Sequence, residues 1–330
     1  MEEKVLDTII KYGLIENNDK LVLGVSGGPD SISMLNILNE IRKENKINLN
    51  FEIVVAHINH MIRKEAKEDE EFVRKFCMEK NIKFYSKSID VKKLANTNKI
   101  GIEEAGRNVR YEFFNEVLEN TGASKIAIAH NKNDNAETVI MNIMRGSGIS
   151  GLKGIEAKRG IYIRPLIECE REEIEKYCEE KNLNPRIDKT NFENEYTRNK
   201  IRNIIIPYVK KEFNPNIINT LERLSNLVKE EEQYIEKQVV DNYKKILIKE
   251  SIEEIILDLK LFNAEEKVIK SRVVLYTITR LFGTSSGIGK IHIEDIIKLC
   301  SNNIGNKYLM PNKKIKVLIK TNKIHFQKQI

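Results

Sequence analysis

The sequence has few cysteines and no long apolar run, and each shortage excludes a class of protein. Its four cysteines lie far apart and form no C-x-x-C pair, which argues against a zinc site or an iron–sulfur cluster and favours buried free thiols. No apolar stretch approaches the roughly 20 residues that a membrane-spanning helix needs. The first residues, MEEKVLDTIIKYGLI, carry acids where a signal peptide carries bases, so we expect a cytoplasmic protein with no membrane partner.

Internal repeats and low-complexity linkers are also lacking, and the length and composition are those of a folded protein. A chain of 330 residues is too long for one ordinary compact core, so a second domain is expected. A content of 41% hydrophobic and 32% charged residues is typical of globular proteins rather than disordered or fibrous ones.

Charge is spread unevenly along the chain. Residues 261–330 contain 13 Lys or Arg against 4 Asp or Glu, whereas residues 1–260 contain 43 against 45. A basic terminal part beside a near-neutral larger part fits a polyanionic partner, and nucleic acid is the commonest such partner. A solvated lysine-rich surface explains the same counts equally well.

Apolar runs of strand length alternate with helical patterns over the first half of the chain. The strand-like runs are 21–26, 52–59, 82–89, 125–130 and 161–167. Apolar residues spaced three and four apart predict helices over 31–45, 64–80, 103–120, 134–145 and 170–181. This alternation predicts an α/β fold with a doubly wound, mainly parallel sheet.

The pattern changes after Asp188 to helix upon helix, with a long amphipathic stretch over 216–244. Residues 311–326, PNKKIKVLIKTNKIHF, then alternate apolar and polar side chains as a terminal hairpin does. We therefore predict a catalytic domain over 1–212, followed over 213–330 by a helical connector and a small basic α+β domain.

Unusual polar residues follow three of the predicted strands. They occupy residues 26–31 after the first strand, 57–63 after the second and 130–137 after the fourth. Ligands of open α/β sheets bind beyond the carboxyl ends of the strands, so these segments predict a binding site.

The first of these segments, SGGPDS at 26–31, resembles a phosphate loop but lacks the lysine of ATP-hydrolysing loops. Gly27 and Gly28 let the backbone approach an anion, and a helix from about Ser31 directs its N–H groups toward it. Without the lysine, such a loop suits holding pyrophosphate as a leaving group while AMP is transferred. Asp30 is placed to bind a magnesium ion that neutralises the phosphates. A plain strand-to-helix turn is the alternative interpretation.

These residues resemble the PP-loop of the N-type ATP pyrophosphatases. Several further segments, in this order and spacing, resemble the tRNA(Ile)-lysidine synthetase family within that superfamily. They are HINHMIR at 57–63, EEAGRNVRYEFF at 103–114, AHNKNDNAETVIMNIMRGSGISGLKGI at 129–155, RPLI at 164–167 and DKTNFENEYTRNKIRNIIIP at 188–207. The resemblance is close over about 20–210 and weaker beyond.

The resemblance implies a ligase that uses ATP and Mg²⁺ to join L-lysine to a tRNA(Ile) with a CAU anticodon. ATP adenylates O2 of the wobble cytidine, and the lysine ε-amine then attacks C2 and displaces AMP, which leaves lysidine. The product reads AUA instead of AUG, and the tRNA accepts isoleucine instead of methionine. Long members of the family continue into another C-terminal domain, and this chain resembles the short architecture or a long one cut off.

The resemblance also assigns residues. The expected pyrophosphate loop comprises Ser26, Gly27, Gly28, Asp30 and Ser31. Ala56 or His57 is expected at the adenine edge. Arg107 is expected to act in catalysis and Arg110 to bind substrate, since the two lie one helical turn apart and suit phosphates of ATP or RNA. Solvated surface charge is the alternative for both arginines.

Further substrate residues are expected in two later segments. Asp134 and Glu137 share a helix face, and a pair of acids suits a substrate with two ammonium groups. The family implies that they bind lysine and that one helps to deprotonate its ε-amine; acids that only offset the helix dipole are the alternative. The family has a second acid where this chain has Asn133, which can form hydrogen bonds but cannot act as a base. Arg198 and Arg202 are expected to form a basic stripe facing RNA or nucleotide.

Three other functions are alternatives to the attachment of lysine. A sulfur-inserting PP-loop enzyme acting on tRNA needs cysteines placed for persulfide or cluster chemistry, and none is so placed. A glutamine-dependent amidating ligase needs a glutaminase segment, which we do not find. A non-catalytic tRNA-binding relative would tend to lose the loop, which is intact here. A homodimer is left open.

Overall fold

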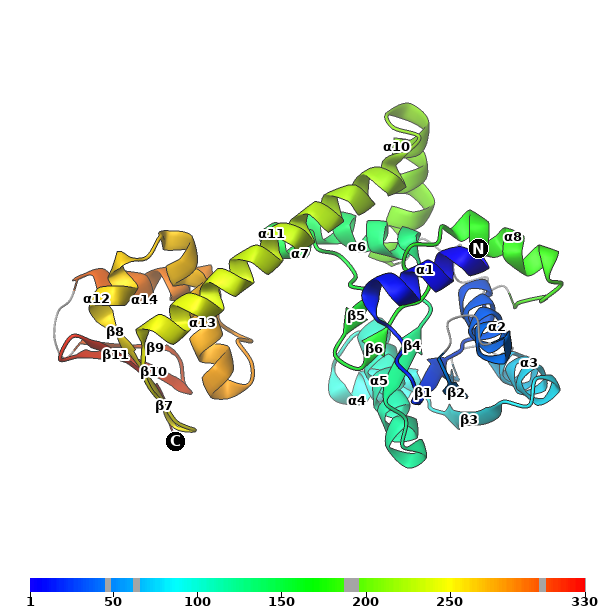
Figure 1. The fold of residues 1–330 in the computed structure, drawn as a ribbon, viewed down its shortest axis with the longest axis horizontal. Coiled ribbons are helices and arrows are strands. Elements are labelled where there is room, and N and C mark those ends of the chain that lie inside the picture. The colour runs from blue at the N-terminus through cyan, green and yellow to red at the C-terminus, as the bar shows by residue number, and fades with distance from the viewer. Residues whose placement is uncertain (45–48, 62–65, 187–195, 303–306, 330) are drawn as a thin grey trace. The chain divides into compact units, whose positions relative to one another are not determined.

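The computed structural model describes residues 1–330 except 45–48, 62–65, 187–195, 303–306 and 330. The described residues form two compact units, Met1–Val228 and Lys229–Ile330, and the division falls inside one long helix, α11 (Ile217–Ile246). Figure 1 labels the elements of both units. Arg63 and 188–195, which belong to the segments singled out above, lie outside the described residues.

The N-terminal unit is built on a six-stranded sheet with the strand order β3-β2-β1-β4-β6-β5. Its strands are β1 (Asp19–Gly24), β2 (Phe51–Asn59), β3 (Lys83–Ser88), β4 (Lys125–Ile128), β5 (Lys158–Arg159) and β6 (Tyr162–Ile163). All neighbouring pairs are parallel except β5 with β6. The predicted mainly parallel sheet is confirmed, and the five predicted strands all form.

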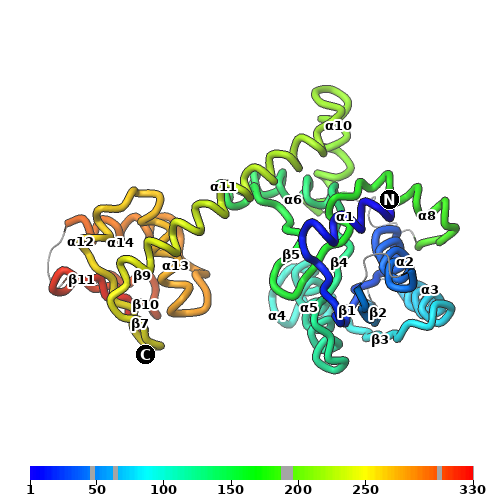
Figure 2. The backbone as a smooth tube through the Cα atoms, viewed as in Figure 1, coloured from blue at the N-terminus to red at the C-terminus, as the bar shows by residue number. Residues whose placement is uncertain are grey.

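Helices connect these strands and continue after them. They are α1 (Glu2–Tyr12), α2 (Pro29–Glu44), α3 (Ala66–Glu79), α4 (Val91–Asn98), α5 (Ile102–Thr121), α6 (Lys132–Met144), α7 (Gly148–Gly151), α8 (Arg171–Glu180), α9 (Thr197–Lys200) and α10 (Ile206–Glu212). A π-helical turn, η2 (Ile201–Ile205), joins α9 to α10, and Figure 2 shows the backbone running through it toward α11. The five predicted crossover helices are confirmed, whereas α1, α4 and α7 were not predicted.

Apolar side chains of β1 point to both faces of the sheet, because successive residues of a strand alternate. Leu21 and Leu23 pack in a core with α1, α2, α3 and α8. Val22 packs in a second core with Phe113 and Phe114 of α5. Helices therefore cover both faces, as the prediction of a doubly wound sheet requires (Figure 1).

The strand predicted over 161–167 is only two residues long, because the chain turns at Pro165. Proline has no N–H to donate to a strand ladder, which confines it to strand ends and edges. The N–H of Ile167 instead bonds the carbonyl of Arg164. This turn leads the chain directly to α8.

Close packing also explains a glycine at the end of β1. A Cβ atom on Gly24 would lie 2.5 Å from two ring carbons of Phe114. Only glycine lets β1 pass this close to α5 at the edge where the phosphate-like loop begins.

The C-terminal unit is a five-stranded antiparallel sheet with three helices. Its strands follow the order β7-β8-β11-β10-β9. The elements are β7 (Leu247–Glu250), β8 (Glu254–Asp258), α12 (Leu259–Ala264), α13 (Lys267–Phe282), α14 (Lys290–Asn302), β9 (Tyr308–Asn312), β10 (Ile315–Lys320) and β11 (Lys323–Lys328). Side chains of the sheet, the three helices and the end of α11 share one core. The predicted terminal hairpin is confirmed as β10 and β11.

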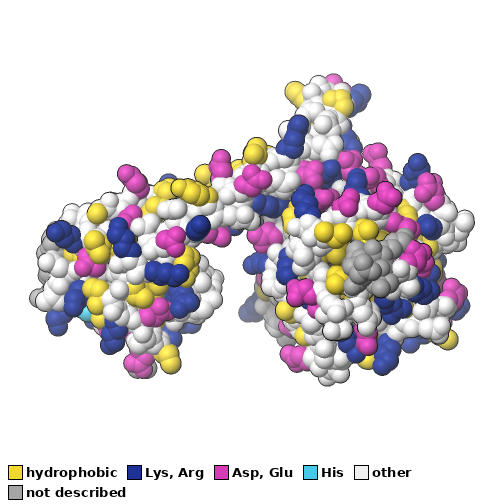
Figure 3. All heavy atoms as spheres, in the orientation of Figure 1, with side chains coloured by type: hydrophobic (Ala, Val, Ile, Leu, Met, Phe, Trp, Pro, Cys, Tyr) yellow, Lys and Arg dark blue, Asp and Glu magenta, His cyan; other side chains and the backbone are white. Residues whose placement is uncertain are grey.

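Lys and Arg side chains form scattered patches on the visible surface of this unit, with Asp and Glu side chains between them (Figure 3). Within the part of the chain that the structure describes, no helix combines the length and the apolar character needed to cross a membrane.

Candidate active site

A cleft of about 1180 Å³ opens where β1, β2 and β4 end. Its lining includes Gly24, Asn59 and Ile128 from these strand ends, and residues from the start of α2 and of α8. This edge of a parallel sheet is where ligands of such folds bind. The three strand ends that the sequence singles out therefore meet in one cleft.

The loop between β1 and α2 folds around the hydroxyl of Ser31. Its Oγ accepts the backbone N–H groups of Ser26 and Gly27, both at 3.2 Å, and donates to the carbonyl oxygen of Gly28 at 3.0 Å. Gly27 has a φ of 96°, in the region that favours glycine. Because α2 begins at Pro29, its positive end lies at the cleft and can attract an anion.

Asp30 lies in the first turn of α2 and lines the same cleft. Its Oδ1 accepts a hydrogen bond from Nδ2 of Asn131 at 2.8 Å. Burial raises the pKa of the Asp30 carboxyl to about 6, and the nearby charge of Asp134 acts in the same direction. The hydrogen bond from Asn131 opposes that rise.

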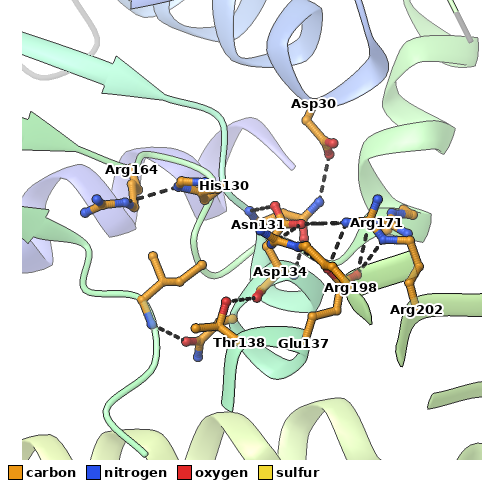
Figure 4. A network of polar contacts seen from close by, with 12 residues as sticks. Asp30, His130, Asn131, Asp134, Glu137, Thr138, Arg164, Arg171, Arg198 and Arg202 are labelled. Atoms are coloured by element: carbon orange, nitrogen blue, oxygen red, sulfur yellow. Dashed lines mark hydrogen bonds and ion pairs between the residues drawn. The ribbon is translucent and has the colours of Figure 1, made fainter. Parts of the chain in front are cut away.

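Asp134 and Glu137 are buried together on α6, and three arginines surround them (Figure 4). Arg202 donates to Glu137 at 2.6 Å and to Asp134 at 2.9 Å, and Arg198 donates to the same carboxylates at 2.9 and 3.1 Å. Arg171 lies farther away, at 3.6 Å from Glu137 and 4.0 Å from Asp134. Burial disfavours the charge of Asp134, but the guanidinium groups of Arg198 and Arg202 hold its pKa below the ordinary value.

Asn133, where the resembled family has an acid, turns toward α8. Its Oδ1 accepts the backbone N–H of Arg171 at 3.0 Å, so it binds the first turn of α8. This contact uses an acceptor oxygen that aspartate also has. An aspartate at this position could accept the same N–H, so Asn133 differs from the expected acid by one negative charge and not by this contact.

A family model described as a PP-loop domain matches residues 1–209. Curated proteins named tRNA(Ile)-lysidine synthase are similar over nearly the whole chain. The protein from Clostridioides difficile is 46% identical over 93% of this chain and 66% of its own length, and that from Clostridium acetobutylicum is 45% identical over 94% and 67%. That from Clostridium tetani is 44% identical over 98% and 68%. The chain belongs to the tRNA(Ile)-lysidine synthase family.

This chain spans about two thirds of the length of these synthases. Among solved structures, a U34-tRNA thiolase from Methanococcus maripaludis with its [4Fe-4S] cluster is similar with a TM-score of 0.56. The two share 22% identity over 69% of this chain and 78% of the thiolase. At that identity the likeness supports the fold alone.

Three further residues at the site are not indicated by the motifs described above. They are Asn131, Arg171 and Arg186. Asn131 and Asp134 form a capping box at the start of α6, a local N-x-x-D spacing that the sequence does display. The N–H of Arg186 bonds Gly27 at 2.9 Å, and its guanidinium bonds Asp69 at 3.2 Å. No sequence signal predicts the Arg186 contacts, because they join distant segments.

The two candidates for the adenine edge lie differently. His57 lines the cleft, and its Nδ1 lies 2.9 Å from the carbonyl oxygen of Val25. Ala56 is fully buried in the core beneath α5, and its carbonyl oxygen accepts the N–H of Val25 at 3.0 Å. Ala56 is not among the described residues that line the cleft.

The ring of His130 has a defined tautomer. Nε of Arg164 lies 3.2 Å from Nδ1 of His130, and because a guanidinium can only donate, this nitrogen must accept. Burial lowers the pKa of His130 to about 4, so the neutral ring carries its proton on Nε2. His130 lines the cleft, which therefore has one more hydrogen-bond donor.

The two arginines of α5 also differ in position. Arg110 lines the cleft. Arg107 is exposed, and its guanidinium lies 5.2 Å from the ring centroid of Tyr111. Among the described residues, Arg107 does not line the cleft. Arg110 therefore lines the same cleft as the loop that we expect to hold phosphates. A catalytic role for Arg107 stays a prediction.

Asp30 fits a magnesium ion that is bound mainly by nucleotide phosphates. Mg²⁺ in such sites takes one or two carboxylates together with phosphate oxygens and water. Asp30 supplies a carboxylate beside the loop, and no cluster of three or more His, Cys, Asp or Glu side chains occurs among the described residues. The residues present therefore suit an ion that arrives with ATP.

We expect Asp30→Asn to make the chain more stable than the wild type at pH 7 and to lose that advantage near pH 4. The folded pKa of Asp30, about 6, exceeds the unfolded value, so the carboxyl favours folding below about pH 4 and loses this effect as the pH rises through 6. The difference between the two free energies of unfolding should change by about 2 kcal/mol. Denaturation of both proteins between these pH values measures it, and a constant difference would show that Asp30 titrates normally.

Proposed function

We propose that the chain catalyses the ATP-dependent attachment of L-lysine to C2 of the wobble cytidine of tRNA(Ile) with a CAU anticodon. The observation that carries this proposal is the cleft, which is lined by the lysine-free loop, Asp30 and Arg202, together with the buried acids Asp134 and Glu137 that bond to Arg202. Membership of the tRNA(Ile)-lysidine synthase family supports it. The modified tRNA reads AUA and accepts isoleucine.

The first step transfers AMP to the base. O2 of the cytidine attacks the α-phosphorus of ATP, and pyrophosphate leaves from the loop formed by Ser26, Gly27, Gly28 and Ser31. Asp30 would hold a magnesium ion that arrives with ATP, and this ion would neutralise the phosphates. Arg110 is the cation of α5 that lines the same cleft, and we assign it to phosphate or RNA.

The second step replaces AMP by lysine. The ε-amine attacks C2, and AMP leaves with the former O2, so the base exchanges a C–O bond for a C–N bond. We assign Asp134 and Glu137 to the ammonium groups of lysine. Arg171 makes the longest of the arginine contacts to these acids, so it is the arginine that lysine displaces most easily. The lowered pKa of Asp134 makes it a weak base, which favours binding over proton transfer.

A cytidine must leave the anticodon stack to reach ATP, and RNA-modifying enzymes commonly extrude the target base. We assign Arg198 and Arg202 to the neighbourhood of the reacting base and the basic C-terminal unit to phosphates of the tRNA. The reaction uses ATP, Mg²⁺, L-lysine and tRNA, and we place it in the cytoplasm.

The rival function, sulfur insertion, requires reactive thiols. All four cysteines are buried and free, and burial raises the pKa of Cys77, Cys169 and Cys300 to about 12. Thiols with such values are rarely ionised and are poor nucleophiles near pH 7. The proposal of lysine attachment is therefore the better supported one.

We expect the chain, incubated with ATP and tRNA(Ile) of CAU anticodon, to release pyrophosphate without lysine and to form lysidine once lysine is added. The physical reason is that the loop holds the β and γ phosphates while reaction occurs at the α-phosphorus. Pyrophosphate is measured by an enzyme-coupled assay, and lysidine by mass spectrometry of nucleosides.

A tRNA with the same sequence but uridine at the wobble position is the control, since it lacks the reacting base. Release of ADP and phosphate instead of AMP and pyrophosphate would refute AMP transfer. Incorporation of sulfur in place of lysine would support the rival function.

A further inference from the structure

Asn131 is a fully buried polar residue that bonds both to Asp30 of α2 and to Asp134 of α6. It is the N-cap of α6, and its Oδ1 accepts the backbone N–H of Asp134 at 2.9 Å. Its own N–H donates to Oδ2 of Asp134 at 3.1 Å. Its Nδ2 donates to Oδ1 of Asp30 at 2.8 Å, across 101 positions of sequence.

These partners leave the amide only one orientation. A backbone N–H can only donate, so the atom facing Asp134 N must be the oxygen. An ionised carboxylate can only accept, so the atom facing Asp30 must be the nitrogen. Exchanging the two ends would break both bonds at once, and the residue therefore fixes the position of Asp30 relative to α6.

Asp30 and Asp134 carry like charges, and the Asn131 amide bonds to both residues (Figure 4). The positive charges of Arg171 on α8 and Arg202 on η2 also oppose the rise in the pKa of Asp30. Both arginines contact the acids of α6. Asn131 is a neutral side chain that bonds to both Asp30 and Asp134. A neutral donor offsets repulsion without adding a charge to a cleft that must accept phosphates.

We propose that Asn131 is the positioning residue that couples the ATP half of the site to the lysine half. Its amide nitrogen holds Asp30 for the nucleotide and its metal ion, and its oxygen fixes the first turn of α6, which carries the lysine-binding acids. The inference rests on the proposed function for the identity of the two substrates. The geometry of the link is independent of that identity.

Substitutions at Asn131 separate the two bonds. Asn131→Ser keeps an oxygen that can cap α6, because serine is a favoured N-cap residue, but it removes the donor to Asp30. Asn131→Ala removes both. Asn131→Asp keeps the cap and places a third carboxylate against Asp30. Asp90→Ala is the matched control, since Asp90 caps α4 through the N–H of Lys93 and does not line the cleft.

We expect Asn131→Ser to slow pyrophosphate release without lysine by about 10- to 100-fold, the range for losing a hydrogen bond to a charged group. Lysine transfer from tRNA adenylated beforehand by the wild type should stay near the wild-type rate. Asn131→Ala should slow both steps, and Asn131→Asp should slow adenylation more than Asn131→Ser does. Asp90→Ala should lower the melting temperature and leave both steps unchanged.

Calorimetric binding of magnesium and α,β-methylene ATP tests the link without turnover. Asn131→Ser should weaken this binding about 10-fold or more relative to the wild type, whereas Asp90→Ala should not. Wild-type binding and adenylation in Asn131→Ser would overturn the inference, as would equal loss of both steps in Asn131→Ser and Asn131→Ala. A wild type that forms no lysidine would refute the proposed function, and the calorimetric comparison would still decide the role of Asn131.

Discussion

Replacing Glu137 by alanine is expected to lower the free energy of unfolding of the N-terminal unit by about 3 kcal/mol, as when one partner of a buried ion pair is removed. The Glu137 side chain is 1% exposed and accepts bonds from both Arg198 and Arg202. Its truncation leaves these two guanidinium groups with Asp134 as their remaining partner on α6. Scanning calorimetry should show the midpoint of this unit falling by roughly 6 to 12 °C.

An exposed ion pair of the same unit provides the control. Glu116 bonds Lys87, and their side chains are 48% and 43% exposed. Glu116→Ala should cost less than about 1 kcal/mol, because water and salt screen such pairs. Glu137→Gln keeps an acceptor oxygen, so its loss in the free energy of unfolding should lie between those of Glu137→Ala and Glu116→Ala. If Glu137→Ala and Glu116→Ala cost the same, the cluster on α6 is not held together by charge.

The same contacts explain why the sequence indicates the shared helix face of Asp134 and Glu137 but not their partners. Their shared helix face follows from a spacing of three, which any helix imposes. Their partners Arg198 and Arg202 come from 61 to 68 positions later in the chain. From the sequence we expect these arginines to face RNA or nucleotide, and periodicity could not show that they bond to Asp134 and Glu137.

The fold was easier to predict than the site. Buried parallel strands and their crossover helices show apolar periods that can be recognised without knowing what they pack against. The sequence therefore predicts β1 to β4 and the helices α2, α3 and α5, but not the short helix α4. The strand predicted over 161–167 is longer than the observed β6, because the chain turns at Pro165. The N-cap role of Asn131 follows from a local spacing, whereas its bond to Asp30 depends on which helix ends meet at the sheet edge.

The uneven charge favours a polyanionic partner, and the family resemblance implies that this partner is tRNA. The structure identifies particular lysines on which the prediction can be tested. Lys320 and Lys323 face each other across the β10–β11 hairpin. Like charges directly opposite on a sheet repel, so a polyanion bound there would relieve a cost already present in the fold. Lys316 of β10 lies with its ammonium 4.8 Å from the ring centroid of Tyr308. These three lysines define a candidate phosphate-binding face, which we call the hairpin lysines.

We expect replacement of all three hairpin lysines by glutamine to weaken tRNA binding and flatten its salt dependence. Each lost phosphate contact should lower the magnitude of the slope of log affinity against log salt by about 0.7 to 0.9. The slope of the triple variant should therefore be smaller in magnitude by up to about 2 to 3. ATP binding should not change, because the hairpin belongs to the C-terminal unit and the cleft to the other. Fluorescence anisotropy with labelled tRNA between about 50 and 200 mM salt measures the slope.

A second triple variant removes the same charge elsewhere. Lys92, Lys93 and Lys99 are exposed on or just after α4 and do not line the cleft. Their replacement by glutamine should leave the slope near the wild-type value. Equal flattening in both variants would mean that net charge, and no particular face, attracts the tRNA. An unchanged slope in the hairpin variant would move phosphate recognition to the N-terminal unit, where Arg110 and Arg202 already line the cleft.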